Sequence, residues 1–145
     1  MMILRSFLAV FAAFASFNVQ AASEWVALSD VNSDSTFVNR ANLTAQGDLV
    51  DVEVLRDFAE TITLGNDAVS GDPLFAHRSI TLTYRVDCSN NTLAMLQWQM
   101  FEGNQGEGTM IWNQQNADGL AYLNAVDPEM NAVLRSACGT TTVAR

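Results

Sequence analysis

The chain has 145 residues, of which 49% are hydrophobic and 16% are charged, and its formal net charge is −9 at pH 7. This length is typical of one domain, and the apolar share excludes a disordered or collagen-like chain. The excess of acidic residues argues against a nucleic-acid-binding protein, because a binding surface for phosphate groups must be basic.

The N-terminus has the three regions of a secretory signal peptide. A short basic start that ends at Arg5 precedes an apolar run over residues 6–17 and a small-residue cleavage motif at residues 19–21. A membrane anchor would need about 18 apolar residues, and the polar Asn18 ends the run earlier. We therefore expect residues 1–21 to be a cleaved signal peptide and residues 22–145 to be a single exported domain without a transmembrane anchor.

Cys88 and Cys138 are the only two cysteines of the chain. In an oxidising compartment they predict one disulfide bond. A crosslink over this span would stabilise the fold by about 4 kcal/mol, because it lowers the entropy of the unfolded chain. A redox or nucleophilic cysteine is less favoured, because no CxxC motif is present.

Most of the remaining chain shows the alternation of apolar and polar residues that is typical of half-buried strands. Turn-like sequences rich in Gly, Asn, Asp and Ser separate the apolar runs. Short strands at near-regular spacing predict an antiparallel meander. The expected strands are residues 25–28, 36–38, 48–58, 77–86, 93–101 and 109–112.

The same alternation assigns faces to the side chains of these strands. In the strand over residues 48–58, three valines would face the core, and Asp51, Glu53 and Asp57 would share the opposite, solvated face. In the strand over residues 77–86, the side chains expected to face outward are Ser79, Thr81, Thr83 and Arg85.

The last element is predicted to be a helix. Asp127 is a suitable N-cap, Pro128 suits the first helical position, and apolar residues then recur at three-and-four spacing up to Cys138. The fold class is therefore α+β, an antiparallel meander with one C-terminal helix packed on it and attached by the disulfide.

The sequence offers little for catalysis or for metal binding. His77 is the only histidine, it lies in no nucleophile motif, and we expect it at the surface or at a sheet edge. The acids around residues 48–57 are the nearest approach to a cluster of metal ligands, but a solvated strand face explains them and their spacing is not that of an EF-hand loop. We expect no enzyme activity, no metal and no cofactor; a hydrolase is the least favoured hypothesis.

Several residues follow one another in a characteristic order. These are Trp25 near the mature start, Gly47 before a strand that ends at Asp57, Ser79 ahead of Cys88, Gly106-Glu107-Gly108 before a strand, and Pro128 opening a helix that ends with Cys138. In this order the chain resembles the surface-adhesin protein E family of exported Gram-negative proteins. The resemblance implies a strongly bent sheet with one helix, and a namesake that binds host matrix and serum proteins and has been linked to haem. Haem would need an axial ligand, and the methionines have the spacing of core residues.

We therefore expect an exported, non-catalytic binding domain with a protein partner, either a host matrix or serum protein or an envelope protein. An exposed strand edge or the hairpin over residues 101–110 would provide the contact, with Trp112 as an aromatic anchor and Asp51, Glu53 and Asp57 as an acidic face. The alternative is a soluble periplasmic envelope or inhibitory protein. The sequence leaves periplasm or cell surface open, is compatible with a homodimer, and indicates no nucleic-acid partner.

Overall fold

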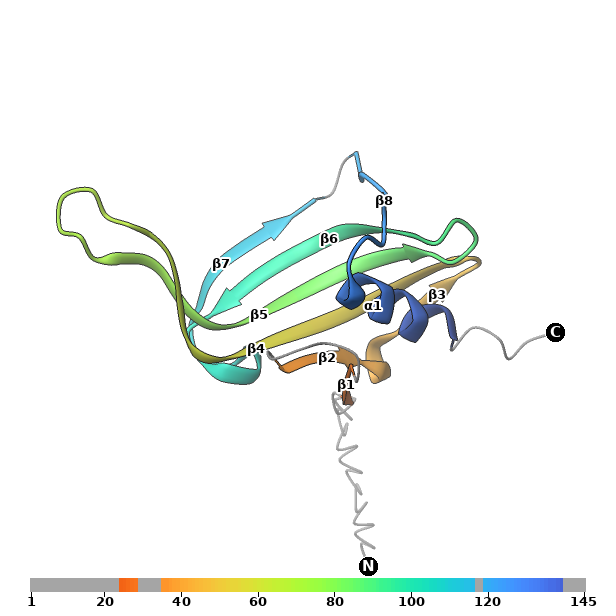
Figure 1. Cartoon of the computed structure of the whole chain (residues 1–145), viewed down its shortest axis with the longest axis horizontal. Helices are drawn as coiled ribbons and strands as arrows, with labels where there is room; N and C mark the ends of the chain where they lie inside the picture. The colour runs from red at the N-terminus through yellow and green to blue at the C-terminus, as the bar shows by residue number, and fades with distance from the viewer. Residues whose placement is uncertain (1–23, 29–34, 117–118, 140–145) are drawn as a thin grey trace, which may run out of the picture.

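The computed structural model describes residues 24–28, 35–116 and 119–139 (Figure 1), so the expected signal peptide lies outside the described residues. Within them, no helix is long and apolar enough to cross a membrane. The elements in chain order are β1 (Trp25–Ala27), β2 (Ser35–Asn39), the 3-10 helix η1 (Arg40–Asn42), β3 (Thr44–Gln46), β4 (Leu49–Asn66), β5 (Pro73–Asp87), β6 (Thr92–Phe101), the 3-10 helix η2 (Asn104–Gly106), β7 (Met110–Gln115), β8 (Leu123–Asn124) and α1 (Pro128–Gly139).

The strands form one antiparallel sheet in the order β1-β2-β4-β5-β6-β7, with β3 paired to β4 and β8 paired to β6. The sheet is strongly bent, and α1 lies across one of its faces, which we name the inner face (Figure 1). The expected α+β fold is confirmed. Two short strands, β3 and β8, were not predicted, because their sequences, Thr-Ala-Gln and Leu-Asn, contain no apolar run.

Valines on alternate positions of β4 form the centre of the core, as their spacing predicted. Val50, Val52 and Val54 are each at most 1% exposed, and Val133 and Ala137 of α1 are equally buried against them. α1 begins as expected, because the side chain of Asp127 accepts a hydrogen bond from the backbone N–H of Met130 at 2.7 Å.

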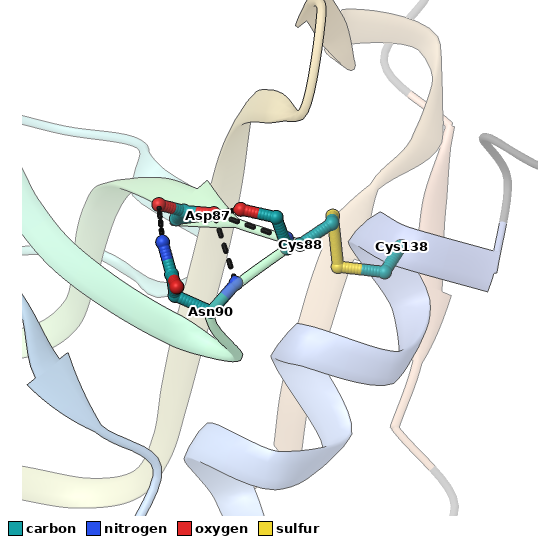
Figure 2. Close-up of a disulfide and its surroundings, with 5 residues drawn as sticks. Asp87, Cys88, Asn90 and Cys138 are labelled. Carbon is teal, nitrogen blue, oxygen red and sulfur yellow. Dashed lines mark hydrogen bonds between the residues drawn. A yellow bond between two sulfur atoms is a disulfide. The ribbon is translucent and has the colours of Figure 1, made fainter.

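Two long-range connections attach α1 to the sheet. Arg56 of β4 forms an ion pair with Glu129 in the first turn of α1, and its Nε donates to Glu129 Oε1 at 2.6 Å. At the other end of the helix, Cys138 is bonded to Cys88, which directly follows β5 (Figure 2). The two Cα atoms lie 5.6 Å apart across a sequence separation of 50 residues. The predicted disulfide is confirmed.

β4 and β5 are longer than the alternation predicted, and together they form a hairpin that projects beyond the rest of the sheet (Figure 1). We name residues 59–76 the arm. At its base Asp57 pairs with Ser79, whereas the next pair is Ile62 with His77, so β4 carries a large bulge. The guanidinium of Arg78 donates to the carbonyl oxygen of Ala59 at 2.9 Å inside this bulge.

The turn between β5 and β6 is organised by the carboxylate of Asp87 beside the disulfide (Figure 2). It accepts hydrogen bonds from the backbone N–H groups of Ser89 and Asn90 and from both of their side chains. These donors lower the pKa of Asp87 from 3.8 to about 2, with the side chains of Ser89 and Asn90 contributing most.

A lowered pKa in the folded state gives a stabilisation that is present above the ordinary pKa and is lost as the pH falls toward the folded pKa. We expect the Asp87 carboxyl carbon to titrate with a midpoint near 2 in an NMR titration. The gap in thermal midpoint between the wild-type chain and Asp87→Ala should narrow as the pH falls from about 4 to about 2. As a control, Ser89→Ala/Asn90→Ala should move the titration midpoint of Asp87 back toward its ordinary value. A midpoint unchanged in that double variant would contradict the assigned cause.

Candidate binding site: an apolar groove beside the free edge of the sheet

The three carboxylates singled out by the sequence do share the outer face of the sheet, but each has partners within the chain. Asp51 accepts two hydrogen bonds from Arg85, both at 2.7 Å. Glu53 accepts from the amides of two neighbouring asparagines, and Asp57 accepts from the side chain of Asn104 and from the backbone N–H of Gln105 at 2.8 Å. These acids therefore hold β5 and two loops in position.

Part of the outer face is buried, which corrects the expectation for β5. Ser79 is 0% exposed and Thr81 is 8% exposed, although alternation placed both toward solvent. The loop between β6 and β7 folds back over them: Ser79 Oγ donates to the carbonyl oxygen of Gly103 at 2.6 Å and accepts from the N–H of Gly106 at 2.9 Å. Gly103 is required at this turn, because a Cβ there would lie 2.7 Å from the carbonyl oxygen of Glu107.

His77 was expected at the surface or at a sheet edge. It does lie at an edge, where β5 pairs with β4 alone, but its side chain is buried. It is 3% exposed, and its ring packs edge to face against Phe58 with the centroids 5.7 Å apart. Its Nδ1 lies 3.2 Å from the carbonyl oxygen of Phe75. The bulge at the base of the arm folds Phe58 over the histidine, and alternation alone does not predict such a bulge.

An apolar groove lies where the arm meets the sheet. Its volume is about 330 Å³, and its walls are Leu64, Gly65, Phe75, Trp98, Met100 and Trp112. Leu64 and Phe75 come from the arm, whereas both tryptophans come from β6 and β7. The rings of Phe75 and Trp112 meet edge to face at a centroid distance of 5.3 Å, which joins the arm to the last strand of the sheet.

Register explains why Trp98, Met100 and Trp112 share the inner face. Trp98 pairs with the buried Leu82, and Met100 pairs with the buried Ile80 on one side and with Trp112 on the other. Paired residues of adjacent strands point to the same face. A bulge in β6 leaves Leu96 without a register partner in β5 and pairs Met95 with Tyr84. Met95, and not Leu96, therefore shares the inner face with Trp98 and Met100, although simple alternation along β6 would place Leu96 there.

Large apolar side chains remain exposed on the arm and at the groove. Trp112 is 39% exposed and Leu64 is 42% exposed. The other exposed apolar side chains of these segments are Ile62, Val69, Leu74 and Met110, at 37%, 96%, 53% and 47%. Sequence reasoning found Trp112 but missed the arm residues, since the predicted strands ended at residue 58 and began again at residue 77. The apolar residues between these bounds, such as Ile62, Leu64 and Leu74, were the signal for a longer hairpin.

The described residues do not bring together three or more His, Cys, Asp or Glu side chains that could hold a metal ion. Around the groove, the accessible groups are aromatic and aliphatic. The arrangement is suited to contact with an apolar surface or side chain, and it offers no group for proton transfer in its walls.

The sheet, the helix and the disulfide define the class of protein: a small α+β domain with a bent antiparallel sheet. The chain matches the family described as Surface-adhesin protein E over residues 25–139, and it belongs to that family. The resemblance predicted from the sequence is thereby confirmed, and membership favours an adhesin-like surface protein over an enzyme.

Solved structures of Haemophilus influenzae protein E have a similar fold. Crystal form II of that protein is 12% identical with a TM-score of 0.58, and the match covers 91% of this chain and 98% of that chain. A second structure is 12% identical with a TM-score of 0.56, covering 83% of this chain and 88% of that chain. Protein E from a non-typeable strain is 11% identical with a TM-score of 0.55, covering 79% and 75%. At these identities the likeness shows the fold alone, and no curated protein matches the chain.

Proposed function

We propose that the chain is an exported, non-catalytic binding domain that contacts a host or extracellular protein through the apolar groove and the arm. The observation that carries this proposal is the joined set of exposed apolar side chains, since soluble proteins rarely leave large apolar patches without a partner. Aromatic side chains such as Trp112 are frequent anchors in interfaces. Export by the signal peptide over residues 1–21 is part of the proposal.

For Asp51, Glu53 and Asp57 we propose a supporting role in partner binding. They lie on the outer face, away from the groove, and hydrogen bonds within the chain engage all three. They keep the sheet and the loop between β6 and β7 in the shape that places Trp112 beside the arm. A direct ion pair with a partner would have to compete with these internal bonds.

Surface exposure and binding are tested together. In intact bacteria that produce the full chain, added protease should cleave it, and the purified domain should bind at least one protein in a panel of extracellular-matrix and serum proteins. Trp112→Ala should weaken that binding about tenfold or more, which is the loss typical of an aromatic anchor. Tyr122→Ala is the matched control, because Tyr122 is also 39% exposed and lies outside the groove.

The result distinguishes between the cell surface and the periplasm, the two locations left open by the sequence. Cleavage on intact cells together with a selective loss in Trp112→Ala supports the proposal. A chain that is protected in intact cells and released with the periplasm would contradict a surface role, and the partner would then be sought among envelope proteins by cross-linking. Equal losses in both variants would contradict the groove as the contact.

A further inference from the structure

β7 forms a free border of the sheet. It pairs with β6 on one side, and within residues 24–28, 35–116 and 119–139 no strand pairs with its other side. In Figure 1 it runs along the outer border of the sheet next to the base of the arm. The opposite border is formed by β1, which has only three residues, whereas β7 has six.

The backbone of β7 has groups available for another strand. The N–H of Asn116 donates to the carbonyl oxygen of Leu96, so this residue faces β6. In an antiparallel ladder, alternate residues face the same neighbour. Gln114 and Trp112 therefore face β6 as well, and Asn113 and Gln115 direct their N–H and C=O groups away from the sheet.

β7 also lacks the features that usually protect an edge strand. Natural edges carry charged side chains, prolines or bulges that prevent pairing with other chains. The sequence of β7, MIWNQQ, has neither a charge nor a proline, and its bulge lies at its first residues, next to Met110. The stretch from Trp112 to Gln115 is regular and open to pairing.

The groove lies directly beside this edge. Ile80, Met100 and Trp112 form one row across β5, β6 and β7 on the inner face. A strand added to β7 would place one side chain next in this row, about 5 Å from Trp112. An apolar side chain at that place would extend the row and cover the exposed part of Trp112.

The charges around the groove restrict the partner further. Residues 59–76 and 101–116, which form the arm and the border of the sheet beside the groove, contain no Arg or Lys, and Arg78 at the base of the arm is engaged by the carbonyl oxygen of Ala59. These two segments carry five carboxylates: Glu60, Asp67, Asp72, Glu102 and Glu107. A partner segment with basic residues beside its apolar ones is therefore favoured, whereas a second copy of this chain would bring its own net charge of −9.

We propose that β7 binds an extended segment of a partner protein by strand addition, with alternating apolar side chains of that segment directed to the groove and basic residues at its ends. This inference rests on the proposed function and specifies its mode of contact. Main-chain hydrogen bonds from Asn113 and Gln115 supply the pairing, and the groove selects the side chains.

The probe is a display library of random twelve-residue peptides, selected on the purified exported domain over residues 22–145. We expect enriched peptides with apolar residues at alternate positions and Arg or Lys near the ends. Upon binding, the amide protons of Asn113 and Gln115 should become protected from exchange with solvent at least tenfold, because they enter hydrogen bonds.

Two variants separate strand addition from simple apolar contact. Asn113→Pro removes an outward N–H, which an edge strand tolerates, and it should weaken peptide binding about tenfold or more. Asn113→Ala is its matched control: it also loses the hydrogen bond that Asn113 Oδ1 accepts from Gln97, but it keeps the backbone N–H and should bind within about threefold of wild type. Circular dichroism spectra and thermal midpoints check that both variants are folded.

Three results would overturn the inference. Peptides that bind equally to Asn113→Pro and wild type would show that the edge is not used, while the proposed function would still hold through the groove. A dimer of the wild-type chain that Asn113→Pro converts to a monomer would assign the edge to a second copy. Failure to enrich any peptide, in a domain that still binds a matrix or serum protein through Trp112, would reject strand addition alone.

Discussion

Replacement of Cys138 by Ser is expected to lower the thermal midpoint by roughly 10–20 °C. The disulfide joins the end of β5 to the last turn of α1 over 50 residues, and loss of such a crosslink costs about 4 kcal/mol on the chain-entropy model. That is a large share of the roughly 5–15 kcal/mol that keeps a domain folded. Differential scanning calorimetry at pH 7 measures the shift.

Two further variants control this experiment. Cys88→Ser should have the same effect as Cys138→Ser, and the double variant should be no less stable than either single one, because all three remove one bond. A reducing agent should lower the midpoint of the wild-type chain and leave the double variant unchanged. A wild-type midpoint that does not respond to reduction would contradict a stabilising role of the bond.

Replacement of Leu55 by Ala is expected to cost about 2–5 kcal/mol of the free energy of unfolding. Leu55 is 2% exposed, yet it lies on the outer face, where it pairs with Phe37 and Thr81. Removal of a buried leucine side chain loses its transfer free energy and leaves a cavity. On a solvated strand face the same change would cost less than about 1 kcal/mol.

Urea unfolding of two variants, one at a buried and one at an exposed position of β4, provides the comparison. Ile62→Ala on the same strand is the control, because Ile62 is 37% exposed, and its cost should stay below about 1 kcal/mol. The slope of the unfolding free energy against urea should be unchanged in both variants. Equal losses of unfolding free energy at the two positions would contradict the burial of Leu55 on the outer face.

The packing on the outer face is relevant to function because it sets the position of β7. The loop between β6 and β7 is fixed to the outer face through Ser79 and Asp57. On the inner face, Phe75 of the arm contacts Trp112 of the same strand. Contacts on both faces therefore hold the edge of β7 beside the groove, and a partner segment would meet a surface that is already formed.

Local signals in the sequence were sufficient for most of the elements. The alternation around Val50, Val52 and Val54 predicted the central strand, and the Asp127-Pro128 pair predicted the start of α1. Two cysteines permit only one pairing, so the disulfide followed as soon as export was expected. Each of these features depends on residues close in sequence or on simple counting.

The site depended on contacts between distant residues. Trp112 was identified as an aromatic anchor, but Leu64 and Phe75 reach it only because β4 continues beyond residue 58 and β5 begins before residue 77, so that both strands extend into the arm. The burial of His77 depends on a bulge that places Phe58 over it. A bulge changes which residue faces the core, and the residues around it show no period that would announce it.

The sequence alone was enough for the fold class, the helix, the disulfide and the acidic character of the chain, because period, capping residues and composition are local properties. The tertiary structure decided which parts of each face are covered, where the apolar groove forms and which edge stays open. These features arise where the loop between β6 and β7 and the arm fold back onto the sheet, and the free energy of that packing belongs to pairs of residues far apart in the chain.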